Sequence, residues 1–273
     1  LTSGGAPAGT VPNNTNRVIV DENSFAGTNR TIHLTGDASC HSVTWLTKNQ
    51  AGMELNGNTL TVGGPFTVSS NSFTINGGTL RFTGNSTEQH SINLGSSNLL
   101  TTGLFFDGEN SSWQLLSTGV VGEIELRKGN LSINAQHMIV GKILSAGDEL
   151  RMLDVRNAKF TGVEQMQFSG TGFTLLTTGS TIADSNTIPT TFELGTYSYA
   201  GSFEFSGEGS LLATSTIGHL KLMGGDYTLG GTPSFQQVDV AEGSKIKFLP
   251  GAVVSFSDKT VIQSNPVNKT EFF

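Results

Sequence analysis

The chain has 273 residues, of which 36% are hydrophobic and only 14% are charged, and 35 of them are glycines. Its net charge of -7 argues against a nucleic-acid partner, because binding nucleic acid needs a basic stripe. The single cysteine excludes an intrachain disulfide framework, and no apolar run is long enough to span a membrane as a helix.

The first segment, residues 1–16, is rich in glycine, proline and asparagine, which predicts a flexible linker. From Val18 onward, apolar and polar residues alternate in short bursts, the pattern of half-buried strands. Good helix formers are scarce, whereas Thr, Val, Ile and Phe, which favour strands, are plentiful. The chain is therefore predicted to be all-β.

The strand bursts repeat along the chain. Residues 64–76 align without a gap on 122–134, and both align on 218–229; residues 113–119 align on 173–179. These offsets are close to multiples of about 19–20 residues, a period typical of solenoids. The sequence thus predicts a single-stranded parallel β-solenoid (β-helix) with about 19–20 residues per coil over 17–265.

Two further expectations follow from the repeats. Phe66, Ile124 and Leu220 should lie directly above one another and share a packing environment. Residues 266–273 should form a tail that continues into further sequence. A string of β-sandwich domains is the alternative fold, although its repeating unit would be longer than the one found here.

The segment 148–160 contains neither glycine nor proline and could be mistaken for a helix. Leu150 and Met152, followed by Leu153 and Val155, instead indicate a strand whose phase slips once. Such a slip is typical of a β-bulge.

Charged residues were considered as candidates for catalysis. Glu123 and Glu125 are two positions apart and should point outward beside Ile124 and Leu126, as on a solvated strand face. Lys245 and Lys247 alternate with apolar residues in the same way. The mixed cluster Arg151, Asp154 and Arg156 is expected to form surface ion pairs.

Other motifs point to structure rather than chemistry. Asp107–Asn110 lacks the ligand spacing of a calcium loop and is expected to be a turn. Cys40 should be buried, with its neighbour His41 on the opposite face. The five histidines have no metal-binding spacing and are expected to be surface polar residues; they are His33, His41, His90, His137 and His219. The prediction is no catalytic residue, no metal site and no cofactor, with binding residues unknown.

The aromatic residues mostly occupy the apolar positions of the alternation and are expected to form the core; these are Trp45, Phe66, Phe73, Trp113, Phe173, Phe203 and Phe205. The run Leu104–Phe106 is an exception, because three consecutive residues cannot all face inward. Phe105 is expected to be the outward one.

With these residues in view, the chain resembles the repetitive surface proteins of gliding Bacteroidota, large adhesins exported by the type IX secretion system. The resemblance covers about residues 18–260. It is carried by the segments 20–25, 37–40, 44–45, 113–115, 122–126, 129–131, 150–153 and 160–162. The sorting domain expected at the C-terminus of that family is not evident in 266–273.

The resemblance implies an extracellular segment of a cell-surface adhesin or stalk, non-catalytic, that attaches to surfaces or glycans and supports gliding motility. The implied partners are a surface or glycan ligand, the secretion machinery and surface-anchoring proteins. The alternative is a polysaccharide lyase or glycoside hydrolase on a β-helix scaffold. A phage or virion fibre segment, which would be an obligate trimer, is a third possibility.

Overall fold

The fold was analysed in a computed structural model, which describes residues 12–25, 30–46, 51–69, 73–95, 98–184, 188–263 and 270–273. These residues form 27 strands, and the described part of the chain contains no helix, hence none that could cross a membrane. Contacts divide the chain into a first unit, residues 1–136, and a second unit, residues 137–273. Both are parallel β-solenoids, as the sequence predicted.

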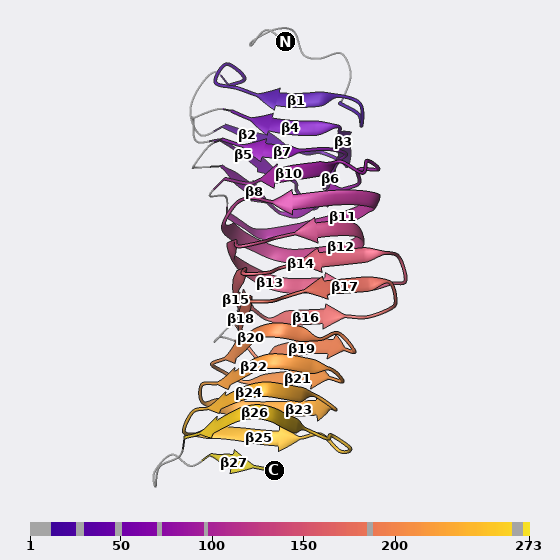
Figure 1. Cartoon of the computed structure of the whole chain (residues 1–273). Helices are drawn as coiled ribbons and strands as arrows, with labels where there is room; N and C mark the ends of the chain where they lie inside the picture. The colour runs from indigo at the N-terminus through magenta and orange to yellow at the C-terminus, as the bar shows by residue number, and fades with distance from the viewer. Residues whose placement is uncertain are drawn as a thin grey trace. The chain divides into compact units, whose positions relative to one another are not determined.

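The first unit has coils with three strands each, one strand on each of three sheets. The first sheet contains β1 (Arg17–Val20), β4 (Ser42–Trp45), β7 (Phe66–Val68) and β10 (Gln89–Asn93), which lie one above another (Figure 1). The second contains β2 (Arg30–His33), β5 (Ala51–Glu54) and β8 (Thr74–Asn76). The third contains β3 (Ala38–Cys40), β6 (Thr59–Val62) and β9 (Gly78–Phe82).

Two long strands complete this unit. β11 (Asn98–Leu115) and β12 (Gly119–Ser132) each run through all three sheets, and register shifts mark the corners between the sheets. One shift falls between Asp107 and Ser112. The segment predicted as a turn is thus a corner inside a continuous strand, with Asn110 at a φ of 56°.

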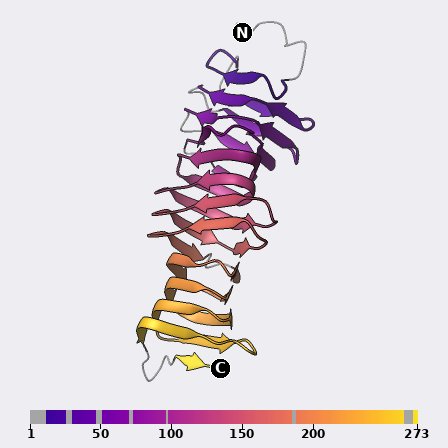
Figure 2. The ribbon, with the colours of Figure 1, turned by 45° about the vertical axis from the view of Figure 1, so that its right-hand side comes forward.

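The second unit begins with β13 (His137–Ser145), which pairs with two later strands, and with the separate pair β14 (Arg151–Asp154) and β17 (Phe173–Leu176). One sheet then contains β15 (Lys159–Val163), β18 (Thr181–Asp184), β20 (Tyr199–Phe205), β22 (Thr216–Leu222), β24 (Ser234–Val240) and β26 (Ser255–Ile262). These strands lie one above another in Figure 2.

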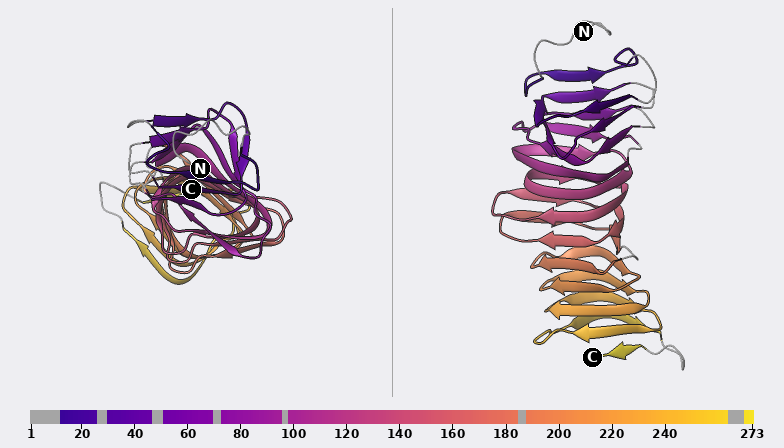
Figure 3. Two further views of the ribbon diagram at one scale, coloured as in Figure 1. Left: turned by 90° about the horizontal axis from the view of Figure 1, so that it is seen from above. Right: turned by 180° about the vertical axis from the view of Figure 1, so that it is seen from behind.

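A second sheet of this unit contains β16 (Gln165–Phe168), β19 (Thr190–Gly195), β21 (Gly209–Ala213), β23 (Gly225–Gly231), β25 (Ser244–Phe248) and β27 (Glu271–Phe272). The view from behind in Figure 3 shows the same stacking. From β19 onward each coil therefore has two long strands rather than three short ones.

The core consists of ladders of inward side chains. Leu60, Leu80 and Leu104 are in register, as are Val62, Phe82 and Phe106 beside them, and all are nearly inaccessible to solvent. The Phe82 and Phe106 rings stack with centroids 5.1 Å apart, a geometry that adds about 0.5–1.5 kcal/mol to simple burial. All seven aromatic residues predicted to be in the core are buried.

The expected stacking of the aligned repeats is wrong in detail. Phe66 lies between Val43 and Ile92 on the first sheet, whereas Ile124 lies against Leu104 on the third. Both side chains are buried, so the alignment found equivalent environments but different sheets. The reason is that coil length varies along the chain, because the corners between strands differ in length. A fixed repeat period therefore drifts from one sheet to another.

The prediction for the segment 148–160 is partly wrong. The segment contains β14, a regular strand that has no register shift, followed by a turn at residues 156–157 and the start of β15. However, Leu150 is 80% exposed and Arg151 is the buried residue beside Leu153. A pattern based on hydrophobicity does not place an arginine inside, which is why the phase was misjudged.

The boundaries predicted for the linker and the tail cannot all be compared with the structure. Residues 1–11 of the predicted linker and residues 264–269 around the start of the predicted tail lie outside the described residues. Residues 12–16 are exposed, and Glu271 and Phe272 form β27, which pairs with β25.

Candidate binding surfaces

Outward side chains of the first unit form ladders like those of the core, because the same register aligns both faces of a strand. On the third sheet, Thr61, Arg81, Phe105 and Glu125 occupy one outward row. Residues that are distant in the sequence thereby become neighbours.

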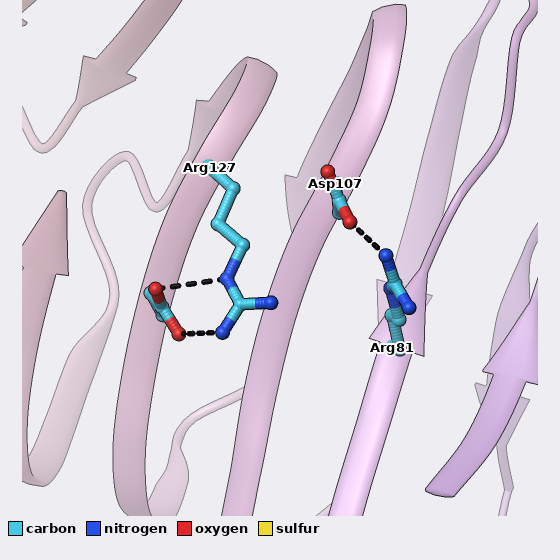
Figure 4. A network of polar contacts seen from close by, with 4 residues as sticks. Arg81, Asp107 and Arg127 are labelled. Carbon is cyan, nitrogen blue, oxygen red and sulfur yellow. Dashed lines mark hydrogen bonds and ion pairs between the residues drawn. The ribbon is translucent and has the colours of Figure 1, made fainter. Parts of the chain in front are cut away.

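Two ion pairs lie on this face, on three adjacent strands (Figure 4). Arg81 pairs with Asp107. The Arg127 guanidinium donates two hydrogen bonds to the Glu125 carboxylate, both 2.8 Å long. That bidentate contact raises the pKa of Arg127.

Phe105 lies within the same cluster. It is half-buried while Leu104 and Phe106 are fully buried, which confirms that Phe105 is the outward residue. The Arg127 guanidinium carbon lies 4.8 Å above the ring centre, a cation–π contact. A Cβ at Gly103 would come within 2.8 Å of the ring, so glycine there lets the ring lie flat on the sheet.

We refer to these five residues, Arg81, Phe105, Asp107, Glu125 and Arg127, as the charged face. Glu123 and Glu125 point outward and Ile124 and Leu126 are buried, as predicted. The sequence did not reveal that stacking would place Arg81, Phe105 and Asp107, from two neighbouring strands, beside Glu125 and Arg127.

A polar groove lies on the first sheet of the same unit, with a volume of about 820 Å³. It is lined by residues of β1, β4 and β10 and of the segments that precede β1, β4, β7 and β10. The lining includes neutral polar side chains and ionisable ones. The neutral ones include Asn14, Thr44, Gln89 and Ser91, and the ionisable ones are Arg17, His41, Glu88 and His90.

Two of the five histidines meet in this groove. Both His41 and His90 line it, His41 against Gly64 and His90 against Gly84. Since Gly64 has no side chain, the His41 imidazole lies over it; a Cβ there would be 3.3 Å from the ring atoms Cε1 and Nε2. His41 and His90 were expected to be scattered surface residues; both are partly exposed, but the stacking of coils brings them to one groove.

His90 is partly held by the core. Its ring lies 4.9 Å from the buried Trp113 ring, and its Nε2 atom is buried without a hydrogen-bond partner. Burial lowers the pKa of His90; the Glu88 charge raises it and the His41 charge lowers it further. Nε2 therefore faces the protein interior.

The remaining histidines lie elsewhere. His33 and His137 are exposed, as predicted. His219, in the second unit, contacts Asp239 with 2.8 Å between Nε2 and Oδ2, so it is not a free surface residue. Among the described residues, no three His, Cys, Asp or Glu side chains are grouped so that they could hold a metal ion.

The predicted cluster Arg151, Asp154 and Arg156 separates into two features. Arg156 pairs with Asp154, 2.6 Å apart, and this contact lowers the pKa of the carboxyl. Arg151 points inward, where its Nη2 donates to the carbonyl oxygens of three loop residues and its guanidinium lies over Phe173. These carbonyls belong to Gly147, Ser169 and Thr171.

Two smaller predictions are confirmed. Cys40 is buried, and burial raises the pKa of its thiol to about 11, so it is not an activated nucleophile. Lys245 and Lys247 point outward from the second unit, beside a hollow of about 450 Å³. There Lys245 lies 3.9 Å from Asp226.

Comparison with known proteins adds no relative: no protein-family model, curated protein or solved structure matches the chain.

Proposed function

We propose that this chain is a non-catalytic attachment segment of an extracellular, cell-surface protein, and that the polar groove of the first unit binds a glycan. The single observation that carries the proposal is the composition of that groove. It is concave and lined mainly by amide, hydroxyl and imidazole groups from successive coils.

These groups match the chemistry of a sugar. Each sugar hydroxyl both donates and accepts hydrogen bonds, and the side chains of Asn14, Gln89 and Ser91 can do the same. Gln89 and Ser91 come from β10, whose backbone is held by pairing with β7 and β11. Preorganised polar groups reduce the entropic cost of binding.

The shape of the groove also suits a chain-like ligand. The groove runs across successive coils rather than closing around one point, so several sugar units can contact it at once. Contacts of this kind are individually weak, and an attachment protein gains strength by repeating them.

The acidic residues support a binding role over a cleaving one. A glycosidase needs two carboxylates on either side of the bond, one of them kept protonated by a raised pKa. On the charged face, Asp107 and Glu125 are each held by an arginine. The pKa of Asp154 is lowered rather than raised.

The cellular setting is part of the proposal. The resemblance to type IX secretion adhesins supports export to the cell surface, anchoring proteins there and a role in gliding motility. The polar, weakly charged composition of the chain is compatible with that setting.

The test is a screen of immobilised oligosaccharides with the wild-type chain and with Ser91→Trp, in which the indole would fill the groove. Thr61→Trp is the matched control, because Thr61 also points outward but lies on the third sheet. We expect binding that Ser91→Trp removes and Thr61→Trp keeps. Equal loss in both variants, no binding, or release of new reducing ends from a bound glycan would contradict the proposal.

A further inference from the structure

The charge of the polar groove differs from that of the chain as a whole. The chain as a whole carries a net charge of -7, but the groove contains Arg17, His41 and His90 and only one carboxylate, Glu88. With both histidines neutral, Arg17 and Glu88 cancel. With both protonated, the groove carries a net positive charge.

The two histidines are close enough to act together. Both line the same groove, and the charge on His41 contributes to lowering the pKa of His90. The charged groups that face them are Arg17 on β1 and Glu88 beside β10; the register partner of His90 on the next coil is the uncharged Trp113. An anion placed between the imidazoles would relieve their mutual repulsion.

We propose that the groove binds a carboxylated saccharide, a uronate-containing glycan, with Arg17, His41 and His90 around the carboxylate and the neutral side chains on the hydroxyls. This inference rests on the proposed glycan-binding function and names its ligand class. The ligand must supply both chemistries, since an acidic group alone would leave Asn14, Gln89 and Ser91 without partners.

A consequence is that acid strengthens binding. A sugar carboxylate remains ionised down to about pH 4.5, whereas an unperturbed histidine gains its proton as the pH falls through about 6.5. Burial lowers the pKa of His90, so its proton is gained at a lower pH. Between about pH 6.5 and 4.5 the ligand stays negative while the groove becomes positive. Binding then takes up protons, because the bound carboxylate favours the charged imidazoles.

The experiment is calorimetric titration of the wild-type chain with a short oligogalacturonate, and with the same oligosaccharide fully methyl-esterified, at about pH 5.5 and about pH 7.5. The ester has the same sugar backbone but no charge. We expect the acid form to bind about fivefold more tightly at the lower pH and the ester to show little pH dependence.

Variants assign the effect to residues. His41→Gln and the double variant with His90→Gln should reduce the pH dependence, and Arg17→Gln should weaken binding at both pH values. His33→Gln is the control, since His33 is exposed on β2 outside the groove. Because His90 packs on Trp113, His41→Gln alone tests the idea if the double variant fails to fold.

The outcomes separate the two proposals. If both oligosaccharides bind equally at both pH values, the groove binds glycans but the uronate inference is wrong. If neither binds, both proposals fail. If a poly-glutamate peptide binds as tightly as oligogalacturonate, the ligand is an acidic chain and the saccharide part is overturned.

Discussion

Both units are stacks of parallel coils, but their coils differ in the number and length of strands. In the first unit, three short strands per coil leave corners of unequal length, so the path from Phe66 to its register partner on the next coil is longer than the path from Leu60 to its own. In the second unit, from β19 onward, two long strands per coil repeat at a shorter and nearly constant spacing until β25.

The difference shows where a groove can form. Irregular corners bring polar residues such as His41 and Glu88 out of line with their neighbours, and the large hollow of the first unit lies there. The hollow beside Lys245 in the second unit is smaller, about 450 Å³, and the regular coils of that unit pair charges across strands. There Lys221 lies in register between Glu204 and Asp239 and contacts Glu204 at 2.6 Å.

The largest expected effect concerns the core ladders, which each unit has. Phe106→Ala in the first unit and Phe203→Ala in the second should each reduce the free energy of unfolding by about 3–5 kcal/mol, because each empties a fully buried position. Phe105→Ala, next to Phe106 but facing outward, should cost about 1 kcal/mol or less. Denaturant titration checks this, and an equal cost for Phe105 and Phe106 would show that the assigned faces are wrong.

The next effect concerns the arginine that replaces an apolar residue inside the second unit. Arg151→Met should destabilise the chain by about 1–3 kcal/mol, since three carbonyl oxygens lose a charged donor. Arg156→Met, which removes an ion pair whose arginine is half exposed, should cost less than Arg151→Met. Thermal unfolding of the two variants side by side measures the contrast; a larger loss for Arg156 would contradict the buried position of Arg151.

A smaller effect is expected on the pH dependence of stability, through His90 in the first unit. Since the folded-state pKa of His90 is lowered below 6.5, the unfolded chain binds the proton more readily. The stability contributed by neutral His90 is therefore complete at pH values above about 6.5 and declines as the pH falls through the folded-state pKa. The free energy of unfolding, followed from about pH 7.5 to 5, should decline less steeply in His90→Gln. A slope that His90→Gln leaves unchanged would assign the effect to another group.

The smallest effect is expected on the charged face. Glu125→Gln removes the anionic partner of Arg127 but leaves Phe105 beneath the guanidinium, so the cost should be about 0–1 kcal/mol. Raising the salt concentration should bring the wild type and the variant together. A difference that persists in high salt would mean that Glu125 has a role beyond the ion pair.

These contrasts also show what could be predicted from the sequence. The alternation of Leu60 with Val62 was enough to predict a half-buried strand, and the repeated strand bursts were enough to predict a solenoid. The pairing of coils was not predictable at residue level, because corners differ in length and shift the register. For that reason Phe66 was matched to Ile124 instead of to Ile92.

The candidate site depends on that missing register. Arg17, His41 and His90 are far apart in the sequence, and only the stacking of β1, β4, β7 and β10 brings them to one groove. The one local signal was the pair of glycines at 63 and 64, which permits the imidazole of His41 to lie over the chain. By contrast, the outward pair Glu123 and Glu125 lies on a single strand, so alternation alone predicted its direction.

The most direct measurement is hydrogen exchange of the chain with and without a glycan that it binds. Slower exchange should be confined to amides of β1, β4, β7 and β10, while β20, β22 and β24 in the second unit exchange as before. Protection on the second unit, or no change on the first sheet, would contradict the assignment of attachment to the polar groove.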